Sequence, residues 1–343
     1  DGGVKYVVLN LISTLLFLTG LGLLYALTGT LNMAHLHLKL QAATNPGLVA
    51  AVAVLFLTAF GIKSGIFPLF FWLPASYHTP PVAVSAIFSG LLTKVGVYAM
   101  IRTFTLIFPF KDNGLGAMVL MAAAATMITG VLGAATHNQV RRILSFHIIS
   151  QVGYMVLGLG LFTPLALAGA VFYVLHHIIV KANLFLISGL MRRAGGSFDL
   201  ERLGGLFSRH GLVALLFFIP AFSLAGFPPL SGFWAKMILI RASLEVGHYL
   251  LAAVAAVVGL MTVYSMTKIW GEAFWKPAPQ DAAEAAAVTG SLNGWMLAPV
   301  VMMAAMTVWI GLSPELLYQL ARAAAEELLD PGVYVATVLG GVR

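Results

Sequence analysis

Four lysines lie well inside apolar segments of this 343-residue sequence: Lys63, Lys94, Lys181 and Lys236. A charged side chain near the middle of a membrane-spanning helix costs roughly 2.5–3.5 kcal/mol on insertion scales, so four cost on the order of 10 kcal/mol. Because desolvation disfavours the charged form, a lysine away from water can gain or lose a proton according to its neighbours. The four are candidate proton-relay residues, although Lys181 and Lys236 also fit lysines that reach out from helix ends.

Three apolar segments also carry polar residues at the spacing of one helix face. The sets are Tyr173, His177 and Lys181 with His176 beside them; His147, Ser150, Gln151 and Tyr154; and Lys94, Tyr98 and Arg102. Residues three or four apart are neighbours on a helix surface. Each set alone is equally well explained by hydrogen bonds between helices. Together with the four lysines, the sets predict a continuous hydrated path through the protein.

The acidic residues are placed differently. None of the twelve Asp and Glu residues lies in the middle of an apolar segment, and only Glu272 comes close to one. A buried cation without a partner is strongly disfavoured. We therefore expect carboxylates to come from partner subunits or from a preceding part of the polypeptide.

Metal, cofactor and nucleic-acid sites are not indicated. Cysteine is absent, and His35 and His37 have no further ligands nearby, so we expect no metal. Walker A, Rossmann and HExxH patterns do not occur, and no cofactor is expected. The net charge of +7 is spread over loops rather than gathered in one patch, which argues against nucleic acid. His78 is a candidate gate or entry residue.

The composition identifies the class of protein. Hydrophobic residues make up 60% of the chain and charged residues 9%, whereas soluble domains have about 45–50% and about 25%. This composition excludes a soluble enzyme, a disordered protein and a secreted disulfide scaffold. We expect an integral, multi-pass membrane protein.

The apolar segments predict nine membrane spans, since about 20 residues cross the hydrocarbon core. They cover residues 6–28, 47–72, 82–107, 114–135, 140–161, 165–190, 211–241, 248–274 and 294–313. Residues 1–313 thus form a transmembrane domain, and residues 314–343 an external amphipathic tail. The sequence enters its first span without Met or a signal peptide, which is typical of part of a longer polypeptide.

The loop charges predict the orientation. With a cytoplasmic N-terminus, that side receives Lys5, Arg141, Arg142, Arg192, Arg193, Arg202, Arg209, Lys268 and Lys276. The other side receives Lys39, Arg102, Lys111, Arg241, Arg322 and Arg343. The excess of basic residues favours a cytoplasmic start and an external C-terminus.

Two of the spans are interrupted. Residues 61–72 and 225–236 each combine glycine, a Phe-Pro step, a Phe-Trp pair and a lysine. Proline and glycine open a helix locally, and the two spans cross the membrane in opposite directions. Such a pair is typical of inverted repeats in transporters. The predicted fold is all-α: a polytopic membrane helix bundle with inverted repeats and two broken helices.

Four stretches resemble the proton-translocating antiporter-like family, shared by Mrp-type cation/proton antiporters and the large membrane subunits of respiratory complex I. They are FGIKSGIFPLFFWLPASYHTPP at 60–81, GLLTKVGVY at 90–98, HNQVRRILSFH at 137–147 and AGFPPLSGF at 225–233. The resemblance covers essentially the whole chain. Family members have about fourteen helices, of which the nine spans resemble the sixth to the fourteenth.

The resemblance implies roles for individual residues. Lys63, in the first broken helix, corresponds to a lysine that pairs with a glutamate of the helix preceding this sequence. Lys94 is the next relay lysine, His177 and Lys181 lie on the central axis, and Lys236 ends the path. His78, Tyr98, His147, Gln151, Tyr173 and His176 are expected to support it.

The short C-terminus and DLERLGG at 199–205 are most similar to the D-type subunits of the Mrp branch. This resemblance implies a Na⁺/H⁺ antiporter component in a prokaryotic cell membrane, with protons, Na⁺ or other monovalent cations, lipid and the other subunits of a hetero-oligomeric complex as partners. The alternative is a proton-pumping component of NADH-quinone oxidoreductase or of a related hydrogenase. A third hypothesis is a scaffold that keeps the fold but no longer transports protons. The four lysines argue against it.

Overall fold

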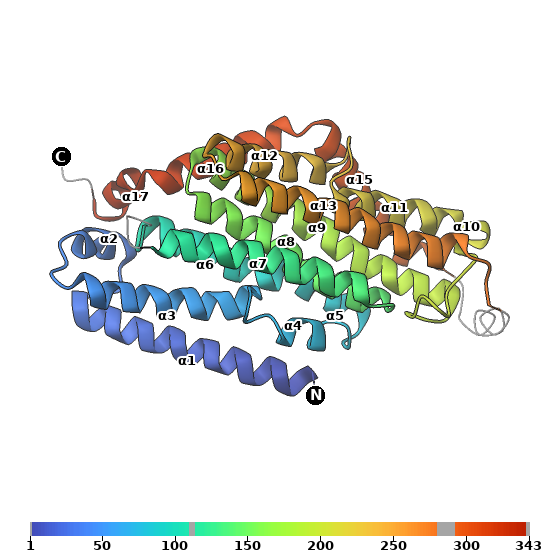
Figure 1. The fold of residues 1–343 in the computed structure, drawn as a ribbon, viewed down its shortest axis with the longest axis horizontal. Helices are drawn as coiled ribbons and strands as arrows, with labels where there is room; N and C mark the ends of the chain where they lie inside the picture. The colour runs from blue at the N-terminus through green and yellow to red at the C-terminus, as the bar shows by residue number, and fades with distance from the viewer. Residues whose placement is uncertain (1, 110–113, 280–291, 341–343) are drawn as a thin grey trace.

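The computed structural model describes residues 2–109, 114–279 and 292–340. Within these ranges the regular secondary structure is helical, apart from one isolated β-bridge between Gln139 and Asp199. The long helices run side by side along one axis (Figure 1). Lys111 and Arg343, which entered the orientation argument, lie outside the described residues.

The N-terminal part consists of α1 (Gly2–Thr28), α2 (Met33–Gln41), α3 (Pro46–Ser64), α4 (Trp72–Ser76), α5 (Val82–Ile87), the π-helix η1 (Phe88–Leu92) and α6 (Thr93–Leu106). The middle consists of α7 (Leu115–Thr136), α8 (Val140–Leu161), α9 (Pro164–Gly195), α10 (Leu206–Arg209), α11 (Gly211–Ala225) and α12 (Ser231–Glu245). The last part consists of α13 (Tyr249–Trp270), the π-helix η2 (Gly271–Trp275), α15 (Gly294–Leu312), α16 (Glu315–Leu329) and α17 (Pro331–Val338).

Eight helical stretches of the described chain are long and apolar enough to cross a membrane, rather than the nine expected. The difference lies in the predicted span 211–241, which the structure divides into α11 and α12. Each half has 15 residues, fewer than the about 20 that a single span needs. A continuous helix is impossible here because Gly226 adopts φ 92° and two prolines follow it.

The chain leaves its helix in the same way at both predicted interruptions. After α3, Gly65 has φ 75° and its N–H donates to the carbonyls of Gly61 and Ile62. After α11, Gly226 donates likewise to the carbonyls of Phe222 and Ser223. Such a left-handed residue satisfies the last carbonyls of a helix and ends it. The continuations differ, because α4 has 5 residues and α12 has 15. The inverted repeat stays a prediction.

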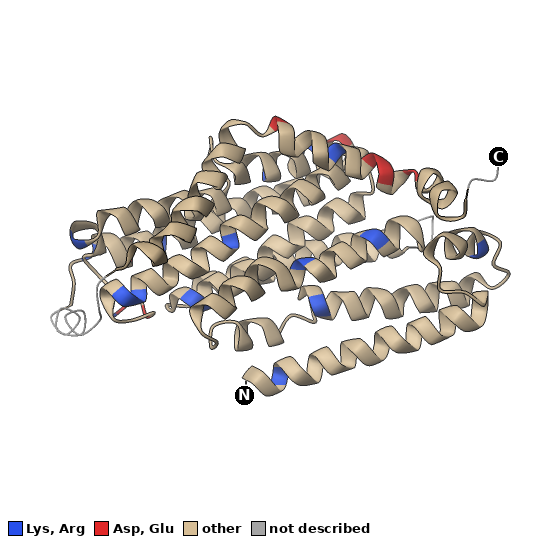
Figure 2. Cartoon of the chain, turned by 180° about the vertical axis from the view of Figure 1, so that it is seen from behind, with Lys and Arg blue, Asp and Glu red and all other residues tan. Residues whose placement is uncertain are grey.

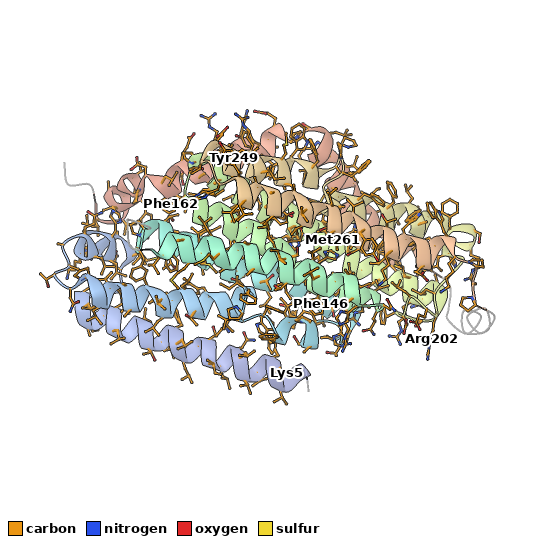
Figure 3. All side chains as sticks on the ribbon, in the orientation of Figure 1. Lys5, Phe146, Phe162, Arg202, Tyr249 and Met261 are labelled. Atoms are coloured by element: carbon orange, nitrogen blue, oxygen red, sulfur yellow. The ribbon has the colours of Figure 1, made fainter. Side chains whose placement is uncertain are left out.

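The two ends of the bundle are distinct. Lys5 and Arg202 lie at one end, and Phe162 and Tyr249 at the other (Figure 3). At the first of these ends Lys268 donates from α13 to the carbonyls of Ala135 and His137, at the end of α7. A cation is favourable beside the carbonyl end of a helix.

The C-terminal segment forms two helices, α16 and α17. Helix α16 packs on α9 and α6 and buries Ala321 and Ala325, while its Arg322–Glu326 ion pair is exposed. Helix α17 packs on α2, and its Tyr334 ring lies 4.3 Å from the Arg102 guanidinium. In Figure 2 the Asp and Glu segments of the visible face gather around α16, whereas Lys and Arg segments run along the bundle.

Helices α8 and α9 form the centre of the bundle, and glycines let their neighbours approach. A Cβ at Gly130 of α7 would lie 2.3 Å from the backbone nitrogen of Ser150 on α8. Small residues of this kind permit close packing of membrane helices. The backbones of α7 and α8 therefore lie close together at this point.

We expect Gly130→Ala to destabilise the bundle by about 1–3 kcal/mol, as overpacking does, because backbone on both sides blocks relaxation. The measurement is the thermal unfolding temperature of the purified complex. Gly22→Ala is the matched control, since its Cβ would meet nothing within 4 Å. Equal unfolding temperatures for the two variants would contradict this packing argument.

Candidate functional site

A row of buried basic side chains crosses the bundle from α6 to α12. Lys94 on α6, His177 and Lys181 on α9, His147 on α8 and Lys236 on α12 are all buried. His177 lies within electrostatic range of Lys94, Lys181 and His147. His147 is in turn within range of Lys181 and Lys236. The structure thus brings together all five of these predicted residues, which we call the basic row.

Lys94 is held by its own helix. Its Nζ donates to the Ser89 carbonyl at 2.5 Å and to Thr93 Oγ1 at 3.2 Å. Ser89 belongs to η1, the π-helical turn that leads into α6. π-Helical turns are rare in proteins, and those that do occur are often found at functional sites. This local arrangement provides a buried position for the amine.

The middle of the basic row lacks protein partners. Among the described residues, the atoms without a hydrogen bond include Lys181 Nζ, both ring nitrogens of His147 and His177, His176 Nε2, Ser150 Oγ, Gln151 Nε2 and the Asn183 amide. Buried polar groups are normally satisfied by protein or by ordered water. The middle of the basic row is therefore a set of buried polar atoms that the described residues leave without hydrogen bonds.

One tyrosine links two helices of the basic row to each other, and a second links the row to α13. Tyr173 of α9 donates to Gln151 Oε1 of α8, and Tyr154 of α8 donates to the Ala255 carbonyl of α13 at 2.5 Å. The two rings stack with centroids 5.3 Å apart. The predicted support residues Tyr173 and Gln151 therefore meet in the core.

The α12 end of the basic row lies at the second helix break. Lys236 Nζ donates to the Ala225 carbonyl at 2.9 Å and lies 5.3 Å from the centroid of the Tyr154 ring. The amine thereby connects α12 with the last residue of α11. His176, a predicted support residue, reaches the same break through Ser231.

Lys63 lies apart from the basic row and faces α1. Its Nζ donates to Asn10 Oδ1 at 2.9 Å, and Asn10 Nδ2 donates to the Tyr6 carbonyl at 2.8 Å. The second bond orients the amide so that its oxygen points to the lysine. Sequence reasoning missed Asn10, because a lone Asn on an apolar helix carries no spacing signal.

Tyr98 does not join the buried residues around Lys94 in this chain, and its role in the path stays a prediction. Lys94 is 3% exposed, whereas Tyr98 is 64% exposed and points away from the bundle. A residue four positions further along is turned by about 40° around the helix axis. At the edge of a buried face, this rotation is enough to bring the side chain outside.

His78 also lies outside the basic row. Its Nδ1 donates to the Pro74 carbonyl at 2.7 Å. Burial lowers the pKa of His78, and Arg141 and Arg142 nearby act in the same direction, against the raising effect of the Pro74 hydrogen bond. From the sequence, Arg141 is predicted only as a loop charge. In the structure it is buried and donates to the Pro80 carbonyl and to Ser85 Oγ. The position of Arg141 inside the 137–147 motif was the available signal.

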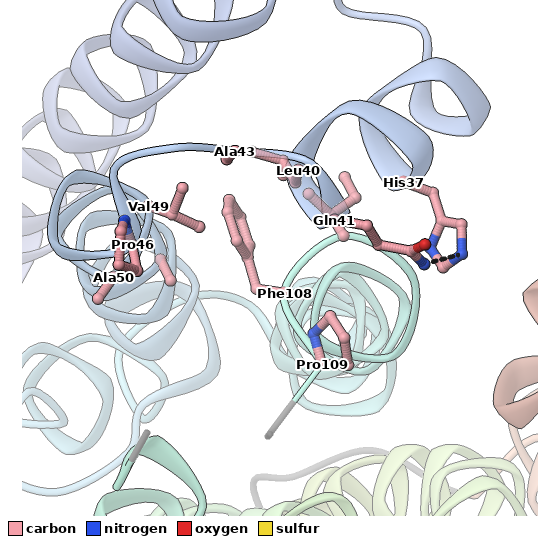
Figure 4. A pocket seen from close by; sticks show the side chains of 11 residues that line it. His37, Leu40, Gln41, Ala43, Pro46, Val49, Ala50, Phe108 and Pro109 are labelled. Carbon is pink, nitrogen blue, oxygen red and sulfur yellow. Dashed lines mark hydrogen bonds between the residues drawn. The ribbon is translucent and has the colours of Figure 1, made fainter. Parts of the chain in front are cut away.

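The hydroxyls nearest to Lys63 and Lys94 in the sequence, which are the candidate oxygens for a monovalent cation, take part in hydrogen bonds. Ser64 donates to the Phe60 carbonyl and Ser89 to the Ala86 carbonyl, while Ser85 and Thr93 accept from Arg141 and Lys94. Within the described ranges, no group of three His, Cys, Asp or Glu residues could hold a metal ion. The hollow drawn in Figure 4 lies away from the basic row, and the ring nitrogens of His37 there are bonded to the Leu106 carbonyl and the Gln41 amide.

Known proteins are similar to this chain in both sequence and architecture. The family described as NADH:quinone oxidoreductase/Mrp antiporter, TM matches residues 1–262. The D subunit of the Na(+)/H(+) antiporter of Alkalihalophilus pseudofirmus is 48% identical over 335 residues, which are 98% of this chain and 67% of that protein.

Two solved structures are similar throughout the chain. A chain of the Mrp complex from Dietzia sp. DQ12-45-1b has a TM-score of 0.89 and 36% identity, covering 98% of this chain and 70% of that one. A chain of the membrane-bound sulfane sulfur reductase, an archaeal respiratory membrane complex, has a TM-score of 0.88 and 27% identity, covering 98% and 67%. The chain therefore belongs to the NADH:quinone oxidoreductase/Mrp antiporter family, in the branch formed by the D subunits of Mrp antiporters.

Proposed function

We propose that the chain moves protons along the basic row, as the D subunit of an Mrp complex that exchanges Na⁺ for H⁺. The observation that carries this proposal is the row itself: three lysines and two histidines, buried and within electrostatic range of one another, on four helices. Each additional positive charge in the row is opposed by the others. A proton that enters at one end therefore favours the release of a proton further along.

Lys63 supplies the coupling to a neighbouring part of the complex. It lies half-buried at the edge of the described chain, with the neutral Asn10 oxygen as its partner. The ion pairs of the described residues are Arg241–Glu245, Lys276–Glu272 and Arg322–Glu326, and none includes Lys63 or the basic row. We infer that a carboxylate from another subunit, or from a preceding segment, alternately binds and releases Lys63, which changes the proton affinity of Lys94.

The hydroxyls near Lys63 and Lys94 hydrogen-bond within the protein, and we assign no sodium ligand among them. The complex lies in a prokaryotic cell membrane, with the N-terminus of this chain on the cytoplasmic side. The two glycine-capped breaks support an inverted repeat that relates the half around α3 to the half around α11 and α12.

Everted membrane vesicles that contain the whole complex test this function. A respiratory substrate first establishes a proton gradient, which a pH-sensitive dye reports, and sodium is then added without NADH. For an antiporter, sodium is expected to collapse the gradient, and vesicles without the complex are expected to keep it. A gradient that sodium leaves unchanged would contradict the proposal.

A proton pump within a redox complex is the second candidate. The similarity to a chain of the sulfane sulfur reductase complex, which extends over 98% of this sequence, favours it. In that case the dye would respond only when the complex itself oxidised its electron donor, and sodium would have no effect.

A further inference from the structure

Two serine hydroxyls connect the halves of the second broken helix. Ser223 Oγ of α11 and Ser231 Oγ of α12 are 3.0 Å apart, and the Gly232 N–H donates to Ser223 Oγ at 3.1 Å. Ser231 Oγ also lies 2.8 Å from His176 Nδ1 of α9. The three side chains are buried. The pair of serines therefore joins α9, α11 and α12 at one point.

Gly232 makes this junction possible. A Cβ at this position would lie 1.8 Å from the Ser223 carbonyl oxygen and 3.1 Å from His176 Nε2. The absence of a side chain brings the start of α12 against the end of α11. It also leaves His176 Nε2 free of steric cover on that side, and Nε2 has no hydrogen-bond partner among the described residues.

The hydroxyl partner of His176 Nδ1 differs in kind from the backbone carbonyls that face Nδ1 of His37 and His78. His37 Nδ1 and His78 Nδ1 face backbone carbonyls, which only accept, so Nδ1 must keep its proton. Ser231 can either accept from His176 Nδ1 and donate to Ser223, or accept from Ser223 and donate to Nδ1. The ring can thus gain, lose or exchange a proton without losing its orientation.

We propose that Ser231, supported by Ser223, is a positioning residue that holds His176 in one orientation through every protonation state. Nε2 then stays beside the start of α12, and His176 carries protons between the centre of the basic row and Lys236, which lies within its electrostatic range. This inference rests on the proposed function.

A matched pair of serine variants tests the inference in the assembled complex. Ser243 is buried on the same helix and donates only to the Leu239 carbonyl of its own helix. We expect Ser231→Ala to lower the rate of sodium-driven proton movement about tenfold, less than the roughly 10²–10⁴-fold that a proton-transfer group itself contributes, because His176 stays in place but loses its fixed orientation. Ser243→Ala is expected to stay within about twofold of the unchanged protein.

A double-mutant cycle distinguishes positioning from a general structural effect. If Ser231 acts through His176, the double variant His176→Leu/Ser231→Ala is expected to be no slower than His176→Leu alone. Losses that multiply, a fully active His176→Leu variant, or equal rates for Ser231→Ala and Ser243→Ala would each overturn the inference. Failure of the proposed function is a different result, since the unchanged complex would then show no sodium-driven proton movement.

Discussion

Lys181→Leu is expected to abolish proton-coupled transport and, at the same time, to make the assembled complex more resistant to heat. Lys181 is fully buried on α9, and its Nζ has no hydrogen-bond partner among the described residues. A buried charge without a partner destabilises a protein, and an apolar residue of similar volume removes that cost. A requirement for Lys181 in transport would explain why the chain has a destabilising lysine at its centre.

The measurement combines transport in vesicles with thermal unfolding of the purified complex. We expect the transport rate to fall at least about 100-fold, as for loss of a proton-transfer group. Lys5→Leu is the control, because Lys5 is exposed at the start of α1 and lies outside the basic row. A Lys181→Leu complex that transports normally would remove Lys181 from the path, and one that unfolds at a lower temperature would show that Lys181 has a structural role.

The sequence predicted those features that depend on composition and local backbone chemistry. The all-helical membrane bundle followed from the apolar segments, and both helix breaks followed from glycine and proline at residues 61–72 and 225–236. The burial of Lys94, Lys181, His147 and His177 followed from their apolar surroundings. Each inference needed only neighbours in the sequence.

Features that depend on which helices meet could not be predicted in this way. The rotation of Tyr98 out of the bundle depends on where the edge of a buried face lies. The bond from Lys63 to Asn10 spans 53 residues, and that from His176 to Ser231 spans 55. The sequence places these residues on different helices and gives no indication that those helices touch.

Lys94→Ala and Lys63→Ala form the second pair of variants with large expected effects. Both are expected to lower transport at least about 100-fold while leaving the amount of assembled complex unchanged. Assembly is preserved because Lys94 bonds only within η1 and the start of α6, and Lys63 gives up one hydrogen bond to an uncharged amide. The measurements are the sodium-driven dye response and the yield of complex purified through a different subunit.

The comparison of the two variants separates the relay from the coupling. Lys94 belongs to the basic row, whereas Lys63 lies outside it and faces α1. Suppose that Lys63 only responds to the binding and release of a neighbouring carboxylate and carries no proton itself. Lys63→Ala is then expected to allow a slow proton leak down an imposed pH gradient, whereas Lys94→Ala is expected to block it. Full activity in either variant would exclude that lysine from the mechanism, and an equal leak through both would show that protons bypass Lys94.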